Sequence, residues 1–224
     1  MPKLSDHTHR FLSKFKLDKV QATVILCSMY IFFSFAGNIA ATKVTYFGKL
    51  VMDAGFIYAL TFTWRDLIHK QLGKKAAITI IWLSAIINLI GALYFQWVVK
   101  LPAETSWALA GGQTAWAFLF GIQFRIVIGS IITMVIAELV DTYVYQIWTQ
   151  GIGKNKPQWL RVVVSNSVSI PIDSVLFPLI AFAGVVSWTA MFQMFATNII
   201  VKAIMTGLSF WMIYLVPEKP IYKK

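Results

Sequence analysis

Residues 53–77 read DAGFIYALTFTWRDLIHKQLGKKAA, and the interpretation of the whole chain starts from this stretch. The apolar segment that leads into it runs from residue 50 to residue 64, about fifteen residues in all. A transmembrane helix needs roughly 20 apolar residues, so this segment is short for a span. It ends on Arg65 and Asp66, becomes amphipathic, and reaches Gly73 and two lysines. Short or interrupted spans mark substrate sites in transport proteins, although a tilted span with a charged cytoplasmic end would also fit.

The composition of the chain places it in a membrane. Of its 224 residues, 58% are hydrophobic and 13% are charged, whereas soluble domains are about 25% charged. Its mean hydropathy is +0.69, which indicates an integral membrane protein of one domain. The net charge of +11 is explained by lysines and arginines that mark cytoplasmic loops, so we expect no nucleic acid partner. The single cysteine, Cys27, excludes an intrachain disulfide and any multi-cysteine metal site.

Apolar segments predict an all-α integral membrane protein, a bundle of six transmembrane helices. These segments lie at residues 20–41, 50–64, 76–99, 115–145, 162–186 and 189–216. We expect residues 1–19 to form a basic cytoplasmic leader, residues 20–216 the six-helix transmembrane domain, and residues 217–224 a short basic tail.

Basic residues alternate between the loops, and this alternation sets the expected topology. Loops placed in the cytoplasm contain Arg65, Lys70, Lys74, Lys75, Lys154, Lys156 and Arg161. Loops placed outside contain only Lys43, Lys49 and Lys100. Because cytoplasmic loops carry the excess of lysine and arginine, both termini are predicted to be cytoplasmic.

The chemical signal lies in ionisable side chains within the apolar segments. A charge at a helix centre costs about 2.5–3.5 kcal/mol on insertion scales, so such residues face a partner or a wet cavity. The positions are Asp66, Arg125, Glu138, Asp141, Asp173 and Lys202. Three of the expected helices also carry polar residues at helical spacing, which predicts shared faces. The pairs on one face are Glu138 with Asp141, Asn198 with Lys202, and Asn166 with Asp173.

Acids outnumber bases among these positions, so the predicted interior is net negative. Such an interior suits a neutral or cationic ligand that donates hydrogen bonds, and it suits an anion poorly. The alternative is a set of internal ion pairs, such as Asp173 with Lys202, that only hold helices together. Asp66 and Glu138 lie toward the cytoplasmic ends of their spans, so we interpret them as a gate or a structural polar cluster.

No enzyme signature accompanies these charges. The sequence has neither a histidine pair with zinc spacing nor the two-aspartate motifs of intramembrane proteases, and we expect no cofactor and no metal. Small residues recur on the first helix at Ala36, Gly37, Ala40 and Ala41. This spacing is a helix-packing signature, used inside a bundle or as a docking face for a partner subunit.

Three ordered segments resemble the queuosine precursor transporter family, also called the vitamin uptake transporter family. They are GFIYALTFTWRDLIHKQLGKKAA, FRIVIGSIITMVIAELVDTYVYQ and SIPIDSVLFPLIAFAG, which begin at Gly55, Phe124 and Ser169. The positions that match are Asn38, Asp66, Gly73, Arg125, Ser130, Asp141, Asp173 and Lys202. Two positions depart from the pattern, because Ala59 replaces a common proline and Lys70 a common glutamate.

The resemblance implies a multi-pass transporter of the bacterial inner membrane that imports 7-cyano-7-deazaguanine or 7-aminomethyl-7-deazaguanine for tRNA queuosine salvage. A carboxylate can accept the paired N–H donors of such a base in bidentate fashion. We therefore assign Asp141 or Asp173 to the base edge, with Lys202 or Arg125 on its carbonyl and Asn38, Asn166 and Asn198 as secondary contacts. Expected partners are the lipid bilayer, the purine-like substrate and further copies of the chain. A substrate-binding subunit of an energy-coupling-factor vitamin transporter, or less readily a membrane-bound enzyme, remains an alternative.

Overall fold

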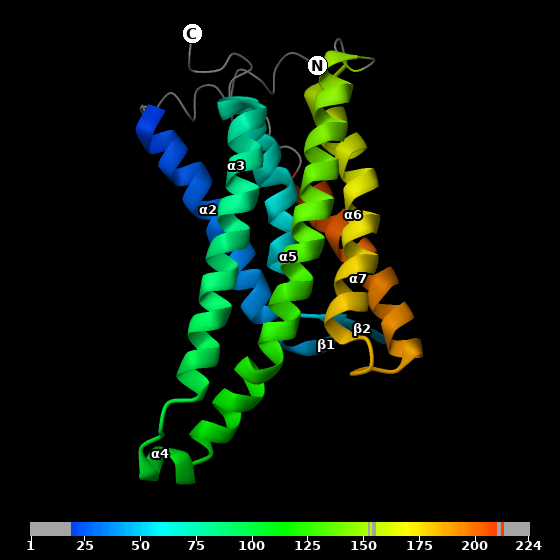
Figure 1. Cartoon of the computed structure of the whole chain (residues 1–224). Coiled ribbons are helices and arrows are strands. Elements are labelled where there is room, and N and C mark those ends of the chain that lie inside the picture. Colours follow the sequence, from blue (N-terminus) through cyan, green and yellow to red (C-terminus); the bar gives the residue numbers. More distant parts are fainter. Residues whose placement is uncertain (1–18, 152, 154–155, 210–211, 213–224) are drawn as a thin grey trace.

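Long helices make up most of the structure, a computed structural model that describes residues 19–151, 153, 156–209 and 212 (Figure 1). The predicted leader, apart from Lys19, and the predicted tail lie outside the described residues. In chain order the elements are α2 (Lys19–Ala40), β1 (Val44–Phe47), β2 (Leu50–Asp53), the 3-10 helix η1 (Phe56–Ala59), α3 (Leu60–Val99), α4 (Thr105–Leu109), α5 (Gly112–Gln150), α6 (Gln158–Phe182) and α7 (Trp188–Ser209).

Five helices are long and apolar enough to cross a membrane. They are Val20–Ala40, Phe56–Val99, Gly112–Gln150, Trp159–Phe182 and Trp188–Ser209. Large apolar side chains such as Phe32, Trp82 and Phe192 are exposed on them, as lipid-facing residues would be. The prediction of an all-α membrane protein is confirmed.

Helix α3 changes direction at Gly73, the glycine of the opening stretch. Gly73 has φ 85° and ψ 172°, a conformation that is essentially restricted to glycine. If α3 were straight, its 40 residues would span about 60 Å. Instead, the two halves of α3 lie side by side (Figure 1). Phe62 and Ala85 share one hydrophobic cluster, and Leu67 and Ile80 share another. The segments predicted at 50–64 and 76–99 therefore contribute to one helix that doubles back.

A short hairpin replaces the start of the predicted span at residues 50–64, so that boundary is wrong. Val44–Phe47 pairs antiparallel with Leu50–Asp53, and Gly48 turns the chain with φ 63°. The two β-branched and two aromatic residues before Gly48 favour strand over helix. The helix itself begins only at Phe56, and Asp53 becomes the last residue of a strand.

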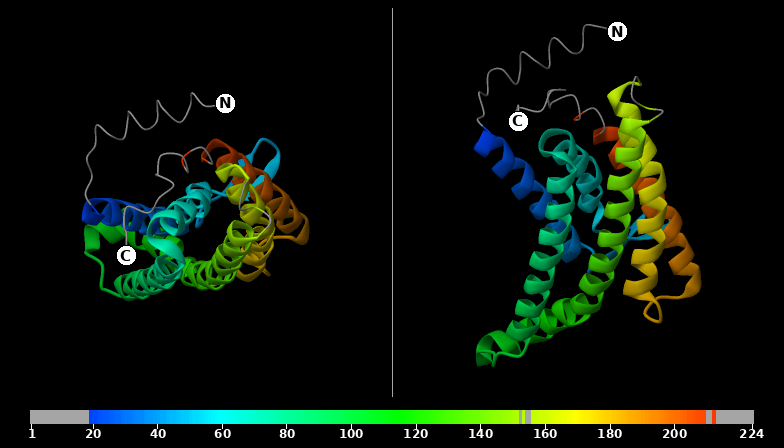
Figure 2. Two further views of the ribbon diagram at one scale, coloured as in Figure 1. Left: turned by 90° about the horizontal axis from the view of Figure 1, so that it is seen from above. Right: turned by 45° about the horizontal axis from the view of Figure 1, so that its top comes forward.

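The bundle is organised around α5, which packs against both α3 and α6 (Figure 2). Helix α2 packs on α3, α7 packs on α6, and β2 lies against α7. At 39 residues α5 is about 58 Å long, nearly twice the hydrocarbon thickness of a bilayer. Its first turns therefore extend beyond the end of α6 toward α4 (Figure 1). Two prolines inside α6, Pro171 and Pro178, flank Asp173 and cannot donate backbone hydrogen bonds.

Candidate functional site

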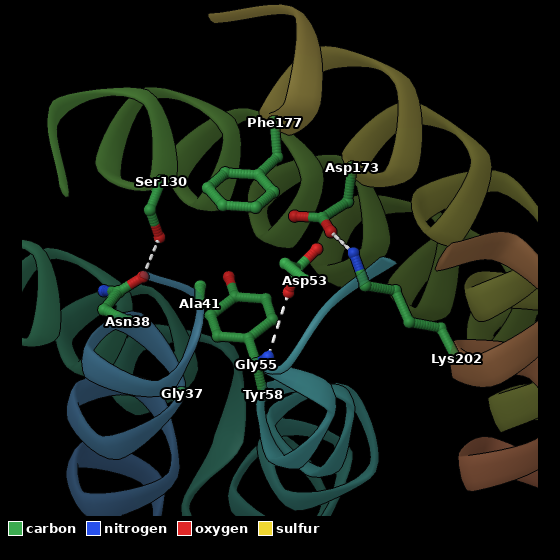
Figure 3. A pocket seen from close by; sticks show the side chains of 10 residues that line it. All are labelled: Gly37, Asn38, Ala41, Asp53, Gly55, Tyr58, Ser130, Asp173, Phe177 and Lys202. Atoms are coloured by element: carbon green, nitrogen blue, oxygen red, sulfur yellow. Dashed lines mark hydrogen bonds and ion pairs between the residues drawn. The ribbon is translucent and has the colours of Figure 1, made fainter. Parts of the chain in front are cut away.

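A small cavity with charged residues on its wall lies where six elements meet (Figure 3). Its volume is about 20 Å³, room for about one water molecule. Helices α2, α5, α6 and α7 contribute to its wall together with β2 and η1. The lining residues are Gly37, Asn38, Ala41, Asp53, Gly55, Tyr58, Ser130, Asp173, Phe177 and Lys202.

Asp173 and Lys202 form an ion pair on the wall of this cavity (Figure 3). The Nζ of Lys202 donates to Oδ2 of Asp173 and also lies 5.9 Å from the centre of the Tyr58 ring. Both charged side chains are buried, with exposed fractions of 3% for Asp173 and 8% for Lys202. The pair links α6 to α7, as the alternative of an internal ion pair predicts, and it also faces a cavity.

Asp53 is a second acid on the cavity wall that the sequence analysis did not assign. Its Oδ1 accepts the Gly55 N–H at 3.0 Å, and its Oδ2 accepts Nδ2 of Asn198 at 3.0 Å. Asn198 and Lys202 are both buried on α7, so their predicted shared face is confirmed. The sequence feature that could have indicated a role for Asp53 is an acid followed closely by glycine at the start of an apolar segment.

Asn38 belongs to a buried amide and hydroxyl network on the opposite wall. Ser130 donates to Oδ1 of Asn38, and Nδ2 of Asn38 donates to Oδ1 of Asn88 at 2.6 Å. Asn88 in turn donates to Ser34 at 3.0 Å and to the backbone carbonyl of Ser84 at 2.8 Å. This network fixes Asn38 and Ser130 at the cavity and connects α2, α3 and α5.

A second buried group, which we call the arginine cluster, consists of Arg65, Asp66, Glu138 and Asp141. Arg65 forms ion pairs with all three acids, and every side chain in the cluster is 0% exposed. The assignment of Arg65 to a cytoplasmic loop was therefore wrong, because its charge is neutralised inside the bundle. Glu138 and Asp141 face the same partner, which confirms their predicted shared helix face.

Four predicted ligand residues do not line the cavity. One of them, Asn198, lies behind Asp53, to which it donates. Asp141 is in the arginine cluster, where Ser169 donates to its Oδ1 at 2.7 Å. Asn166 is buried and its Nδ2 lies 3.5 Å from Oγ1 of Thr206. Arg125 is exposed, and its guanidinium donates to the carbonyls of Ile180 and Ala183 at the end of α6. Arg125 therefore caps a helix end in this structure.

The buried charges of the described residues are unbalanced. Carboxyl groups exceed lysine and arginine side chains by three if all of them are ionised. The acids are Asp53, Asp66, Glu138, Asp141 and Asp173, and the bases are Arg65 and Lys202. An interior with this charge favours a neutral or cationic ligand over an anion.

Comparison with known proteins shows the family to which this chain belongs. The family model described as "Putative vitamin uptake transporter" matches residues 53–216, most of the chain. The chain belongs to this family. It is also 25% identical over 184 residues to the "Probable queuosine precursor transporter" of Bacillus subtilis (strain 168), covering 78% of this chain and 76% of that protein. No solved structure matches it significantly.

The resemblance drawn from the sequence motifs is thereby confirmed, and this multi-pass membrane protein is a transporter. The family match begins at Asp53, the last residue of β2. It therefore covers the cavity wall from β2, η1, α5, α6 and α7. Gly37 and Asn38 on α2, and Ala41 directly after it, precede the match.

Gly37 lets α2 approach η1 closely enough to shape the transporter's cavity. A Cβ on Gly37 would lie 2.9 Å from Cβ of Tyr58, too close without a shift of the η1 backbone. We expect Gly37→Ala to destabilise the protein by about 1–3 kcal/mol, the usual cost of overpacking. The matched control is Gly121→Ala on α5, because a Cβ there meets nothing within 4 Å. Thermal unfolding in detergent should show a lower midpoint for the first variant only, and equal midpoints would contradict the close packing.

Proposed function

We propose that this transporter imports a 7-deazaguanine precursor of queuosine, in its 7-cyano or 7-aminomethyl form, across the bacterial inner membrane. The named relative supports the substrate class. The single structural observation that carries the proposal is the Asp173–Lys202 pair on the wall of a central cavity. Buried intramembrane charges that face a cavity are the usual signature of a substrate pathway.

The chemistry of the cavity suits a guanine-like base. Such a base presents adjacent N–H donors beside a carbonyl oxygen, and the Asp173 carboxylate can accept two donors in bidentate fashion. Lys202 carries only donors and would bind the carbonyl. Tyr58 and Phe177 supply aromatic rings at the same cavity for stacking on the flat base. Asp53 offers a second carboxylate for an aminomethyl cation.

Binding of a base requires the cavity to open, because its present volume holds about one water molecule. The substrate would separate Asp173 from Lys202. Its N–H donors would then bind Asp173, and its carbonyl oxygen would bind Lys202. We place the hairpin on the outer side and Gly73 on the cytoplasmic side, with both termini cytoplasmic. The reversal of α3 at Gly73 then makes six membrane crossings, and access alternates between the two sides of the cavity.

Complementation tests this function directly. A bacterial strain that lacks both queuosine synthesis and its own precursor transporter would express this chain, and each precursor would be supplied separately. We expect queuosine to reappear in tRNA with at least one of the two precursors. If tRNA lacks queuosine under both conditions while the protein is present in the membrane, this substrate assignment is wrong.

A further inference from the structure

The arginine cluster holds more negative charge than its one guanidinium can balance. Three carboxyl groups surround Arg65, all of them fully buried. If every acid were ionised, the cluster would carry an excess of two negative charges. Buried charge that lacks a partner is strongly unfavourable within a membrane. At least one of these carboxyls is therefore expected to bind a proton.

The hydrogen bonds of Thr61 favour Glu138 as the carboxyl that binds the proton. The hydroxyl oxygen of Thr61 lies 2.6 Å from the carbonyl of Tyr58 and 3.1 Å from Oε1 of Glu138. Both of these neighbours are acceptors when Glu138 is ionised, yet a hydroxyl has one hydrogen to donate. A proton on Oε1 resolves the conflict, because Glu138 then donates to Thr61 while Thr61 donates to Tyr58.

Titratable groups from several elements face Glu138. They are Tyr30 of α2, Tyr58 of η1, Arg65 and Asp66 of α3, and Asp173 of α6. Among the described residues, no group of three acidic, histidine or cysteine side chains is arranged to hold a metal ion.

We propose that Glu138 is a proton-binding site that couples substrate import to the proton gradient. This inference rests on the proposed function in one respect, namely that the transported solute is a purine-like base. Thr61 connects the proton to the cavity, because the Tyr58 whose carbonyl it binds also lines the cavity. When Glu138 releases its proton, Thr61 turns its hydrogen toward the carboxylate and no longer donates to the Tyr58 carbonyl. Loss of that bond loosens η1 beside the substrate.

The proton site is tested first without substrate. Infrared spectroscopy of the purified transporter should show the C=O band of a protonated carboxylic acid, and Glu138→Gln should remove that band. Glu104→Gln is the matched control, because Glu104 is an exposed acid that caps α4. Absence of the band from the unaltered protein, or its persistence in Glu138→Gln, would overturn the assignment of the proton to Glu138.

Coupling is tested in proteoliposomes whose membrane potential is clamped. With one proton per neutral base, an inward gradient of one pH unit should give about tenfold accumulation of labelled 7-cyano-7-deazaguanine. Glu138→Gln and Thr61→Val should lose accumulation yet retain exchange of base for base, and Thr61→Ser should keep both. Accumulation that follows only a sodium gradient, or that ignores both gradients, would overturn the coupling. If the infrared band is present and no base is transported, the substrate assignment fails while the proton site is supported.

Discussion

Asp173→Asn is expected to reduce uptake of labelled 7-cyano-7-deazaguanine by about 100-fold. The asparagine side chain has the shape of aspartate, but it offers one acceptor oxygen and no charge to a pair of N–H donors. Hydrogen bonds to charged groups contribute about 1.5–3 kcal/mol each, so weakening two of them accounts for roughly two orders of magnitude. The measurement is initial uptake rate in cells, normalised to the amount of transporter in the membrane.

A purely structural ion pair would give a different result, and a double variant separates the two roles. Asp173→Asn alone leaves Lys202 buried opposite a neutral group, which lowers stability as well as affinity. Combining it with Lys202→Met removes both charges and should restore much of the thermal stability. We expect the double variant to fold and still fail to transport. Recovery of uptake together with stability would show that the pair only holds α6 against α7.

The sequence predicted the helices and their polar faces well, because both depend on local periodicity. Glu138 and Asp141 are three residues apart, so any helix there places them on one face. The same reasoning predicted that Asn198 and Lys202 share a helix face, and both side chains are buried. The hairpin was missed because its second strand is as apolar as a span, although residues 44–47, with which it pairs, have strand-favouring side chains.

Residues that act through distant partners were harder to predict. Arg65 follows an apolar segment, and an arginine in that position commonly extends to the cytoplasmic interface. Its burial depends on Glu138, which lies 73 residues further along the chain. Asp53 likewise reaches the cavity through the hairpin and through Asn198, 145 residues away. Hydropathy and helical spacing contain no information about such contacts.

Arg65→Met is expected to destabilise the transporter by about 3–5 kcal/mol, the cost of removing one partner from a buried ion pair. The substitution leaves three carboxyls at the contact of α3, α5 and α6 with no cation among them. The proton that we place on Glu138 limits the repulsion only in part, since Asp66 and Asp141 also lose their ion pair. The measurement is thermal unfolding in detergent together with the yield of monodisperse protein.

The matched control is Arg125→Met, which removes the same side chain from an exposed site where it binds two carbonyls. We expect a cost near 1 kcal/mol there, as for ordinary hydrogen bonds at a helix end. Adding Asp141→Asn to Arg65→Met should recover part of the lost stability, because it removes one of the stranded charges. Independent, additive effects of the two substitutions would contradict direct contact, since residues in one charge network couple by about 0.5–3 kcal/mol.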